Sequence, residues 1–282
     1  MEAGVFYVVA TPIGHLDDIT RRAVQVLGQV DLILAEDTRH SLPMLRRLGI
    51  DTPVQPLHEH NERRWLGPII GRVEAGENVA LISDAGTPLI SDPGYLLVRA
   101  LRDRGLSVVP IPGPSALTCA LSAAGVPTHR FVFEGFLPPR RGQRIERLRS
   151  LEREPRTVVF FEAPHRVLAL LQDLVAVFGG DRPGVVAREL TKVFETFRRG
   201  TLVELHAWLQ AHREQRKGEF VILVEGAPEA ERSLLSLRSE ETLRALLPVL
   251  PVKQAVSVAA QLTGQKRNAL YRQAMMLVER GL

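Results

Sequence analysis

The sequence lacks the residues and runs that mark several large classes of protein. A single cysteine, Cys119, excludes an internal disulfide, and the eight histidines show neither HxxxH nor paired Cys/His spacing typical of zinc. The longest apolar runs, such as residues 5–10 and 158–161, fall far short of the roughly 18 residues that span a bilayer. No charged-then-apolar leader precedes them. We therefore expect a soluble, cytoplasmic protein that holds no metal.

Common nucleotide-binding and hydrolase motifs are also missing. There is no GxGxxG after the first apolar run, no GxxxxGK[ST] and no GxSxG. The usual dinucleotide, ATP and esterase sites therefore lack their glycine-rich loop or nucleophile turn.

Length and composition indicate a globular protein of more than one domain. Hydrophobic residues make up 45% and charged residues 24% of the 282 residues, which is ordinary for a folded chain. The net charge of +4 is by itself a weak argument for nucleic acid. Its distribution says more, because residues 233–282 hold seven Lys/Arg against three Glu, and residues 138–156 hold seven Arg against three Glu.

The first half alternates β-rich runs with amphipathic stretches. Strands are expected at 5–10, 32–35, 79–82 and 107–110, and helices at 17–27, 38–48, 90–104 and 114–124. Such alternation predicts a parallel sheet with helices on its faces. Ligands of these sheets sit beyond the carboxyl ends of the strands.

A second alternating block follows, and a helical tail ends the chain. Its expected strands are 131–136, 157–162, 184–189 and 219–225, with helices at 143–151, 166–178 and 203–212. The sequence therefore predicts an α/β fold with an N-terminal domain at 1–126, a second α/β domain at 127–230 and a basic helical tail at 231–282.

The loop SDAGTPLISDPG, residues 83–94, is the most specific local feature. Two Asp, two Gly and two Pro within twelve residues give a rigid, sharply turned loop whose backbone can face a ligand. A simple strand-to-helix connection needs only two or three residues, so its length favours a binding site.

Other strand ends are also polar. The first domain adds TPIGHLDDIT (11–20), EDTRHS (36–41) and PIPGPSAL (110–117), and the second adds FFEAPHR (160–166), ARELTKVFET (187–196) and RKGEF (216–220). Helix capping would also explain Asp37, and a surface ion pair would explain Lys192 with Glu195. Taken together, the loops predict a cleft between the two domains.

Seven motifs occur in the order TPIGHLDDIT, LILAEDTRHS, LISDAGTPLISDPG, PIPGPSAL, FVFEGFLP, ARELTK and KGEFVILVEG. Together they resemble the ribosomal RNA small subunit methyltransferase I family of the tetrapyrrole methylase superfamily over essentially the whole chain. The resemblance implies 2′-O-methylation of a cytidine ribose in the decoding region of 16S rRNA, with S-adenosylmethionine as donor and a homodimer as the acting form. Relatives that methylate tetrapyrroles carry GxGxGD where this chain has Thr11 to Gly14, and His15 stands where the RNA-modifying group usually has asparagine.

The resemblance also implies a set of cofactor-binding positions at the interdomain cleft. These are Asp84, Ala85, Gly86, Thr87, Pro88, Asp92, Ser115, Ala116, Phe161, Glu162, Ala187 and Arg188. Alignment of the ribose oxygen should dominate the rate, with a general base contributing on the order of 10² to 10⁴-fold. The catalytic candidates, by their location at strand ends, are Glu36, Asp37, Glu189 and Lys192, among which the sequence does not choose.

The tail reads as an apolar helix to Leu262, a turn at Gly264 and a second helix that begins with Lys266 and Arg267. This pattern fits a helix-turn-helix that contacts RNA phosphates, or a small helical cap without that role. The RNA-contact candidates over the whole chain are Thr11, Pro12, Gly14, Arg39, Arg140, Arg141, Lys266, Arg267 and Arg272. Two other functions stay open on sequence alone: a tetrapyrrole C-methyltransferase, and a DNA-binding regulator that uses the tail.

Overall fold

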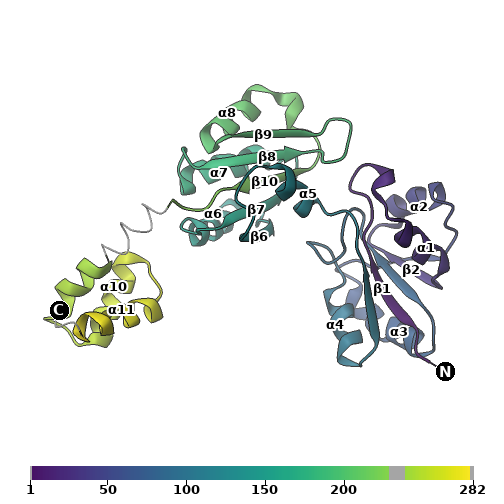
Figure 1. The fold of residues 1–282 in the computed structure, drawn as a ribbon, viewed down its shortest axis with the longest axis horizontal. Helices are drawn as coiled ribbons and strands as arrows, with labels where there is room; N and C mark the ends of the chain where they lie inside the picture. Colours follow the sequence, from purple (N-terminus) through teal and green to yellow (C-terminus); the bar gives the residue numbers. More distant parts are fainter. Residues whose placement is uncertain (1, 229–238, 280–282) are drawn as a thin grey trace. The chain divides into compact units, whose positions relative to one another are not determined.

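The computed structural model describes residues 2–228 and 239–279, which form two compact units. The first unit comprises residues Met1–Arg149 and Thr157–Glu225, and the second comprises Ser150–Arg156 and Gly226–Leu282. Both sheets of the protein belong to the first unit (Figure 1). The boundary expected after residue 126 therefore separates two sheets inside one compact unit.

The first sheet is parallel throughout, as the alternating sequence predicted. Its five strands are β1 (Val5–Val9), β2 (Leu32–Ala35), β3 (Val54–Pro56), β4 (Val79–Ile82) and β5 (Ser107–Ile111), in the order β3-β2-β4-β1-β5. All four pairings are parallel. The carboxyl ends of β1, β2, β4 and β5 consequently share one edge, where the polar loops begin.

Helices cover both faces of this sheet because successive strand residues point to opposite sides. Leu32 and Leu34 pack toward α3 (Glu62–Glu74) and α4 (Tyr95–Asp103), whereas Ile33 and Ala35 pack toward α1 (Arg21–Gln29) and α2 (Thr38–Arg47). Buried on both sides, the strands read as continuous apolar runs.

The second sheet is mixed. Its strands are β6 (Phe131–Phe136), β7 (Thr157–Glu162), β8 (Pro183–Arg188), β9 (Thr196–Thr201) and β10 (Phe220–Val224), in the order β6-β7-β10-β8-β9. β10 runs antiparallel to both β7 and β8. The end of β7 and the start of β10 therefore lie at the same edge, which brings two distant polar segments together.

Helix α5 (Ala116–Ala123) packs on one face of the second sheet through Ala120 and Leu121. The remaining helices of the first unit are α6 (Arg141–Leu151), α7 (Val167–Phe178) and α8 (Leu202–Ala211), with short 3-10 turns η1 (Leu16–Asp18) and η2 (Arg213–Arg216). A buried ion pair fastens α6 to α7, since the side chains of Arg144 and Asp173 are 6% and 1% exposed and lie 2.6 Å apart.

Three elements were not expected from the sequence, and two helices begin later than expected. β3 has only three residues, α3 contains Gly67, Pro68 and Gly71, and the edge strand β9 reads TFRRGT. Short length, weak helix propensity and polar edge residues hide such elements from pattern analysis. Helix α1 begins at Arg21, after the capping Thr20, and α4 begins only at Tyr95.

The second unit is helical. Residues 239–246 form one helix, followed by α10 (Val252–Thr263) and α11 (Arg267–Glu279). Gly264 ends α10 in the left-handed conformation, with φ at 67°, as the expected turn requires. Ala259, Leu270 and Ala274 share its apolar core. The expected helical tail is confirmed over the described residues, with a turn at Gly264 between α10 and α11.

Candidate functional site

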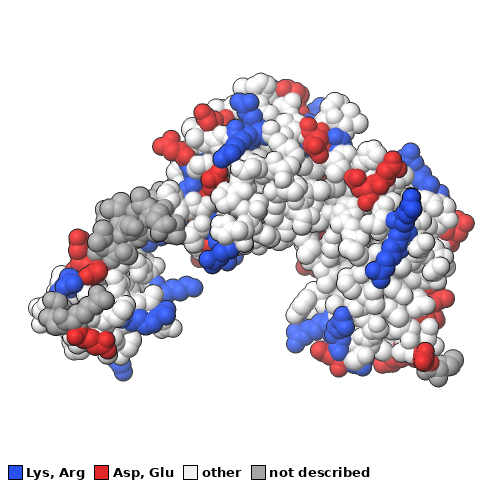
Figure 2. Space-filling model, viewed as in Figure 1, with Lys and Arg blue, Asp and Glu red and all other residues white. Residues whose placement is uncertain are grey.

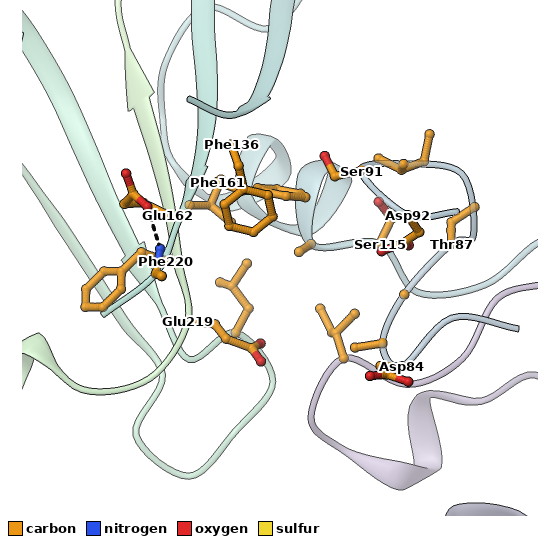
Figure 3. Close-up of a pocket in the computed structure, with 18 of the residues that line it drawn as sticks. Asp84, Thr87, Ser91, Asp92, Ser115, Phe136, Phe161, Glu162, Glu219 and Phe220 are labelled. Atoms are coloured by element: carbon orange, nitrogen blue, oxygen red, sulfur yellow. Dashed lines mark hydrogen bonds between the residues drawn. The ribbon is translucent and has the colours of Figure 1, made fainter. Parts of the chain in front are cut away.

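A cavity of about 320 Å³ lies in the first unit, at the edges where the strands of both sheets end (Figure 3). One wall comes from the loops after β4 and β5, and the other from β6, the end of β7 and the start of β10. The lining residues are Ile13, Asp84, Ala85, Gly86, Thr87, Ile90, Ser91, Asp92, Ser115, Ala116, Phe136, Phe161, Glu162, Ala163, Pro164, Leu190, Glu219, Phe220 and Val221.

The loop after β1 is hydrogen-bonded to the cavity-lining loop that follows β4. Thr11 pairs with Gly86 in an antiparallel bridge, in which Thr11 N donates to Gly86 O at 2.9 Å and Gly86 N donates to Thr11 O at 3.0 Å. The Thr11 hydroxyl donates to Ser83 O at 3.2 Å, and the residue is fully buried. Thr11 therefore holds two loops together, and its side chain is not accessible to RNA in this structure.

The loop of residues 83–94 adopts the strained backbone that its composition indicated. Leu89 and Ser91 both have a backbone φ of 72°, in a region that residues other than glycine rarely adopt. The Thr87 hydroxyl donates to Pro114 O at 3.0 Å and ties this loop to the one after β5. Strain that surrounding contacts maintain is typical of binding loops.

Carboxylates gather on this wall. Asp84 accepts a hydrogen bond from Asp37 N at 2.9 Å and faces His40 Nδ1 at 3.3 Å. Burial raises the pKa of Asp92 to about 7, and the negative charges of Glu36 and Asp84 also raise it. A hydrogen bond from Ser83 acts in the opposite direction. Burial, followed by the charges of Asp84 and Asp37, also raises the pKa of Glu36. This wall therefore carries several carboxylates close together, and a bound cation would stabilise their charged forms.

The opposite wall is aromatic. Phe161 packs edge-on against Phe133, with ring centroids 4.9 Å apart, and against Phe136, at 5.7 Å. Figure 3 shows Phe136 and Phe161 across the cavity from Asp92 and Ser115, with the carboxylate of Glu219 below the two rings. One wall therefore presents aromatic rings together with Glu162 and Glu219, and the other is polar and acidic.

The segment between β8 and β9 adds a charged cluster beside the cavity. Lys192 Nζ lies 3.0 Å from Glu189 Oε1 and 3.2 Å from Glu219 Oε2. The pKa of Lys192 is raised. Burial by itself would lower it, but the hydrogen bonds to the two carboxylates and their negative charges outweigh that effect. Burial acts to raise the pKa of Glu189, but the hydrogen bonds from Lys192 and Glu219 N outweigh it and lower the pKa.

Gly14 is the point where the loop after β1 meets this cluster. A Cβ at this position would lie 2.5 Å from Lys192 Cγ and 2.8 Å from Thr191 Oγ1. His15 N donates to the same hydroxyl at 3.0 Å, and His15 Nδ1 accepts from Asp17 N at 3.3 Å. His15 therefore caps the following 3-10 turn.

Most of the expected cofactor positions line the cavity, and three do not. Pro88 and Ala187 are buried outside its lining. Arg188 is buried too, and its guanidinium donates to Lys217 O at 2.8 Å and Phe194 O at 2.9 Å. Arg188 therefore organises the segment that carries Lys192.

None of the four catalytic candidates is among the lining residues. Glu36 and Asp37 interact with Asp84, and Glu189 and Lys192 interact with Glu219. Asp37 caps α2, and hydrogen bonds from Arg39 lower its pKa well below the usual range. Sequence reasoning did not select the lining residues Ile13, Ile90, Ser91, Phe136, Ala163, Pro164, Leu190, Glu219, Phe220 and Val221. For Glu219 and Phe136, the motifs RKGEF and FVFEGF were available signals.

The expected RNA contacts are spread over both units. Arg39, Arg140 and Arg141 are exposed in the first unit, although Arg39 pairs with Asp37 and Arg141 with Asp173 at 2.9 Å. Figure 2 shows basic and acidic side chains interspersed on the visible face of this unit.

The remaining RNA candidates differ in accessibility. Pro12 is partly buried and Gly14 exposed. In the tail, Lys266, Arg267 and Arg272 are exposed, and Arg267 Nη2 donates to Ser257 Oγ at 2.9 Å.

Within residues 2–228 and 239–279, no cluster of three or more His, Cys, Asp or Glu side chains is arranged to bind a metal ion. Over the same residues, no helix combines the length and apolarity needed to cross a membrane.

Comparison with known families covers nearly the whole chain. The model of the Tetrapyrrole (Corrin/Porphyrin) Methylases matches residues 5–206, and that of the RsmI C-terminal HTH domain matches residues 227–277. The ribosomal RNA small subunit methyltransferase I of Pseudomonas aeruginosa is 53% identical over 277 residues, which is 98% of each chain. The protein of the same name from Escherichia coli O157:H7 is 49% identical over 272 residues, covering 96% of this chain and 95% of that one.

Solved structures share the fold at low sequence identity. The methyltransferase CobJ superposes with a TM-score of 0.60 at 21% identity, covering 80% of this chain and 95% of that one. Uroporphyrin-III C-methyltransferase of Thermus thermophilus, complexed with S-adenyl homocysteine, has a TM-score of 0.56 at 20% identity, covering 82% of this chain and all of the other.

Proposed function

We propose that this chain, which belongs to the tetrapyrrole methylase family and within it to the ribosomal RNA small subunit methyltransferase I proteins, methylates small-subunit ribosomal RNA with S-adenosylmethionine. The target is the 2′-hydroxyl of a cytidine ribose in the decoding region of 16S rRNA. The enzyme acts in the cytoplasm as a homodimer. The observation that carries the proposal is the cavity with acidic and aromatic walls in a chain that is about half identical to named rRNA methyltransferases.

The residues of the cavity fit this cofactor. Its volume of about 320 Å³ falls in the range of small-molecule sites, roughly 300 to 1,000 Å³. Asp84 and Asp92 would attract the cationic groups of the cofactor, and Phe161, Ala116 and Val221 offer apolar surface for its heterocycle. When bound, the cofactor supplies a methyl group already activated by its attachment to a cationic sulfur.

The residues of the chain position the ribose and assist the removal of the proton from its 2′-hydroxyl. The oxygen that accepts the methyl group must lose a proton as the new bond forms, and negative charge develops there. Lys192 is held by Glu189 and Glu219, and its raised pKa keeps it protonated at neutral pH. We assign it to stabilising that charge rather than to removing the proton.

The four catalytic candidates therefore divide by chemistry. Asp37 is a weak base because Arg39 lowers its pKa, and Glu189 is weakened by the hydrogen bonds it accepts. Glu36, whose pKa is raised by burial and by the charges of Asp84 and Asp37, is the stronger base. We propose Glu36 as the group that receives the proton, with Lys192 at the reacting oxygen.

The exposed basic side chains of the tail would bind RNA phosphates, because they are presented by the second helix of a helix-turn-helix. Removing residues 233–282 should then weaken RNA binding more than cofactor binding. An equal loss of both would assign the tail a purely structural role.

The direct test offers the purified full chain methyl-labelled cofactor with three acceptors: naked 16S rRNA, small subunits from a strain that lacks this methylation, and porphyrin precursors. We expect label in the RNA or the subunits, at a cytidine whose ribose methylation stops primer extension at low nucleotide concentration. Label in the porphyrin precursors alone would reverse the substrate assignment. Sedimentation analysis of the same sample tests the homodimer.

A further inference from the structure

Phe136 lies in the cavity wall because strand β6 contains a β-bulge. The pairing of β6 with β7 sets Phe133 opposite Val159, Gly135 opposite Phe160 and Phe136 opposite Phe161, so the register shifts by one residue after Phe133. If the ladder continued regularly from Phe133 with Glu134 paired, Gly135 would stand opposite Phe161, and Phe136 would point to the other face of the sheet. The bulge therefore turns this ring into the cavity, which is a known use of bulges beside active sites.

Two contacts maintain the bulge. The extra residue, Glu134, is held by Arg147 of α6, whose Nε and Nη2 lie 2.7 Å and 2.8 Å from its carboxylate oxygens. Gly135 has φ of 62°, and a Cβ on it would lie 2.7 Å from Ser91 Oγ. Only glycine suits that position, so the motif FVFEGF encodes the placement of the second ring.

The ring of Phe136 is fixed on one side and open on the other. It packs edge-on against Phe161, which packs edge-on against Phe133, so three rings support one another. Phe136 nevertheless stays 55% exposed while it lines the cavity. A ligand that covered the ring would remove apolar surface from water, which is favourable.

We propose that Phe136 is a binding residue on which an aromatic heterocycle held in the cavity stacks. The inference rests on the proposed function, which supplies two such heterocycles: the adenine of the cofactor and the cytosine of the target nucleotide. Both present a flat π face, and stacking on an aromatic side chain suits either. The experiment below distinguishes these two sources.

The test uses the full chain with three substitutions. Phe136→Ala removes the ring, Phe136→Leu keeps apolar volume without a π face, and Phe136→Tyr keeps the face. Phe131→Ala is the matched control, because Phe131 lies in the same strand and is 40% exposed but does not line the cavity. Calorimetric titration with S-adenosylhomocysteine in the absence of RNA reports the cofactor, and KM for small subunits reports the RNA.

We expect Phe136→Ala and Phe136→Leu to weaken one of the two affinities by roughly 5- to 100-fold, the range for loss of one base stacked on an aromatic side chain. Phe136→Tyr and Phe131→Ala should stay within about twofold of the wild type. A rise confined to the dissociation constant of S-adenosylhomocysteine identifies adenine, and a rise confined to KM for the subunits identifies the nucleotide base.

Two results would overturn the stacking role: Phe136→Leu behaving like the wild type, or Phe136→Ala changing neither affinity. Gly135→Ala gives a second route, since it should disturb the bulge and lower the same affinity as Phe136→Ala while the ring is still present. Failure of the wild type to bind S-adenosylhomocysteine or methylate RNA would refute the proposed function itself. That outcome is separate, because the stacking role is judged from differences between variants.

Discussion

Asp92 should lower the unfolding free energy of the cofactor-free protein at neutral and alkaline pH. The substitution Asp92→Asn, which leaves no charge to bury, should remove this loss of stability. Burial raises its pKa from the ordinary value of 3.8 to about 7. Between these values the folded state keeps a proton that the unfolded state has released, so stability falls as pH rises. At about 1.36 kcal/mol per pH unit, the penalty above pH 7 is at most roughly 4 kcal/mol, and solvent screening of this partly exposed carboxylate reduces it.

The assay is urea unfolding of cofactor-free protein at pH 5 and pH 8. The folded and unfolded pKa values imply that Asp92 alone makes the wild type about 2 to 3 kcal/mol less stable at pH 8 than at pH 5. Asp92→Asn should lack this part of the pH dependence and be more stable at pH 8. Asp51→Asn, which changes an exposed carboxylate, serves as the control.

The same carboxylate should make cofactor binding depend on pH. If the cationic cofactor binds only when Asp92 is ionised, its apparent affinity should fall about tenfold between pH 8 and pH 6, since the ionised fraction falls by that factor around a pKa near 7. S-adenosylhomocysteine, which lacks the sulfonium charge, should show a smaller change. Parallel pH profiles of stability and affinity for the wild type and Asp92→Asn would refute this reasoning.

Four further substitutions test other parts of the structure. Asp173→Ala leaves the buried guanidinium of Arg144 without its carboxylate, and urea unfolding should show a loss of about 3 to 5 kcal/mol. Gly28→Ala lies inside α1, where an added Cβ meets nothing within 4 Å, and should raise the unfolding free energy by about 0.5 to 1 kcal/mol. Lys192→Ala should lower kcat by about 10²-fold, as removal of one charge-stabilising group does, while calorimetry shows unchanged cofactor affinity. Glu36→Gln should lower kcat and flatten its pH profile.

Each of these expectations has an outcome that contradicts it. An Asp173→Ala variant as stable as the wild type would mean that Arg144 finds other partners or leaves the interior. A less stable Gly28→Ala would reveal a constraint on α1 that the structure does not contain. If Lys192→Ala loses cofactor affinity and keeps kcat, Lys192 belongs to the cofactor site, and an unchanged pH profile in Glu36→Gln would remove Glu36 as the base.

The local elements with a strong sequence pattern could be predicted from the sequence. The apolar run Leu32–Ala35 reads as a buried strand because both of its faces are covered, and Gly264 predicts a helix end because only glycine takes the left-handed conformation there without strain. The elements β3, α3 and β9 were not predicted, because their short length or unusual composition carries little local signal for a strand or a helix.

The candidate site was only partly predictable. The composition of residues 83–94 and the ordered motifs indicated which loops carry it, because strand ends of a parallel sheet gather at one edge whatever the details of packing. Conversely, Thr11 and Arg188 looked like ligand contacts by their motifs, and in the structure their polar groups bond to backbone carbonyls.

By itself, then, the sequence determined the alternating α/β architecture, the helical tail and the loops that hold the chemistry, since backbone preferences and hydrophobic periodicity are local properties. Only the tertiary structure decided that Glu219 joins Lys192 and that Phe136 turns into the cavity. Both depend on strand order and register, which arise from contacts between residues that are distant in the chain.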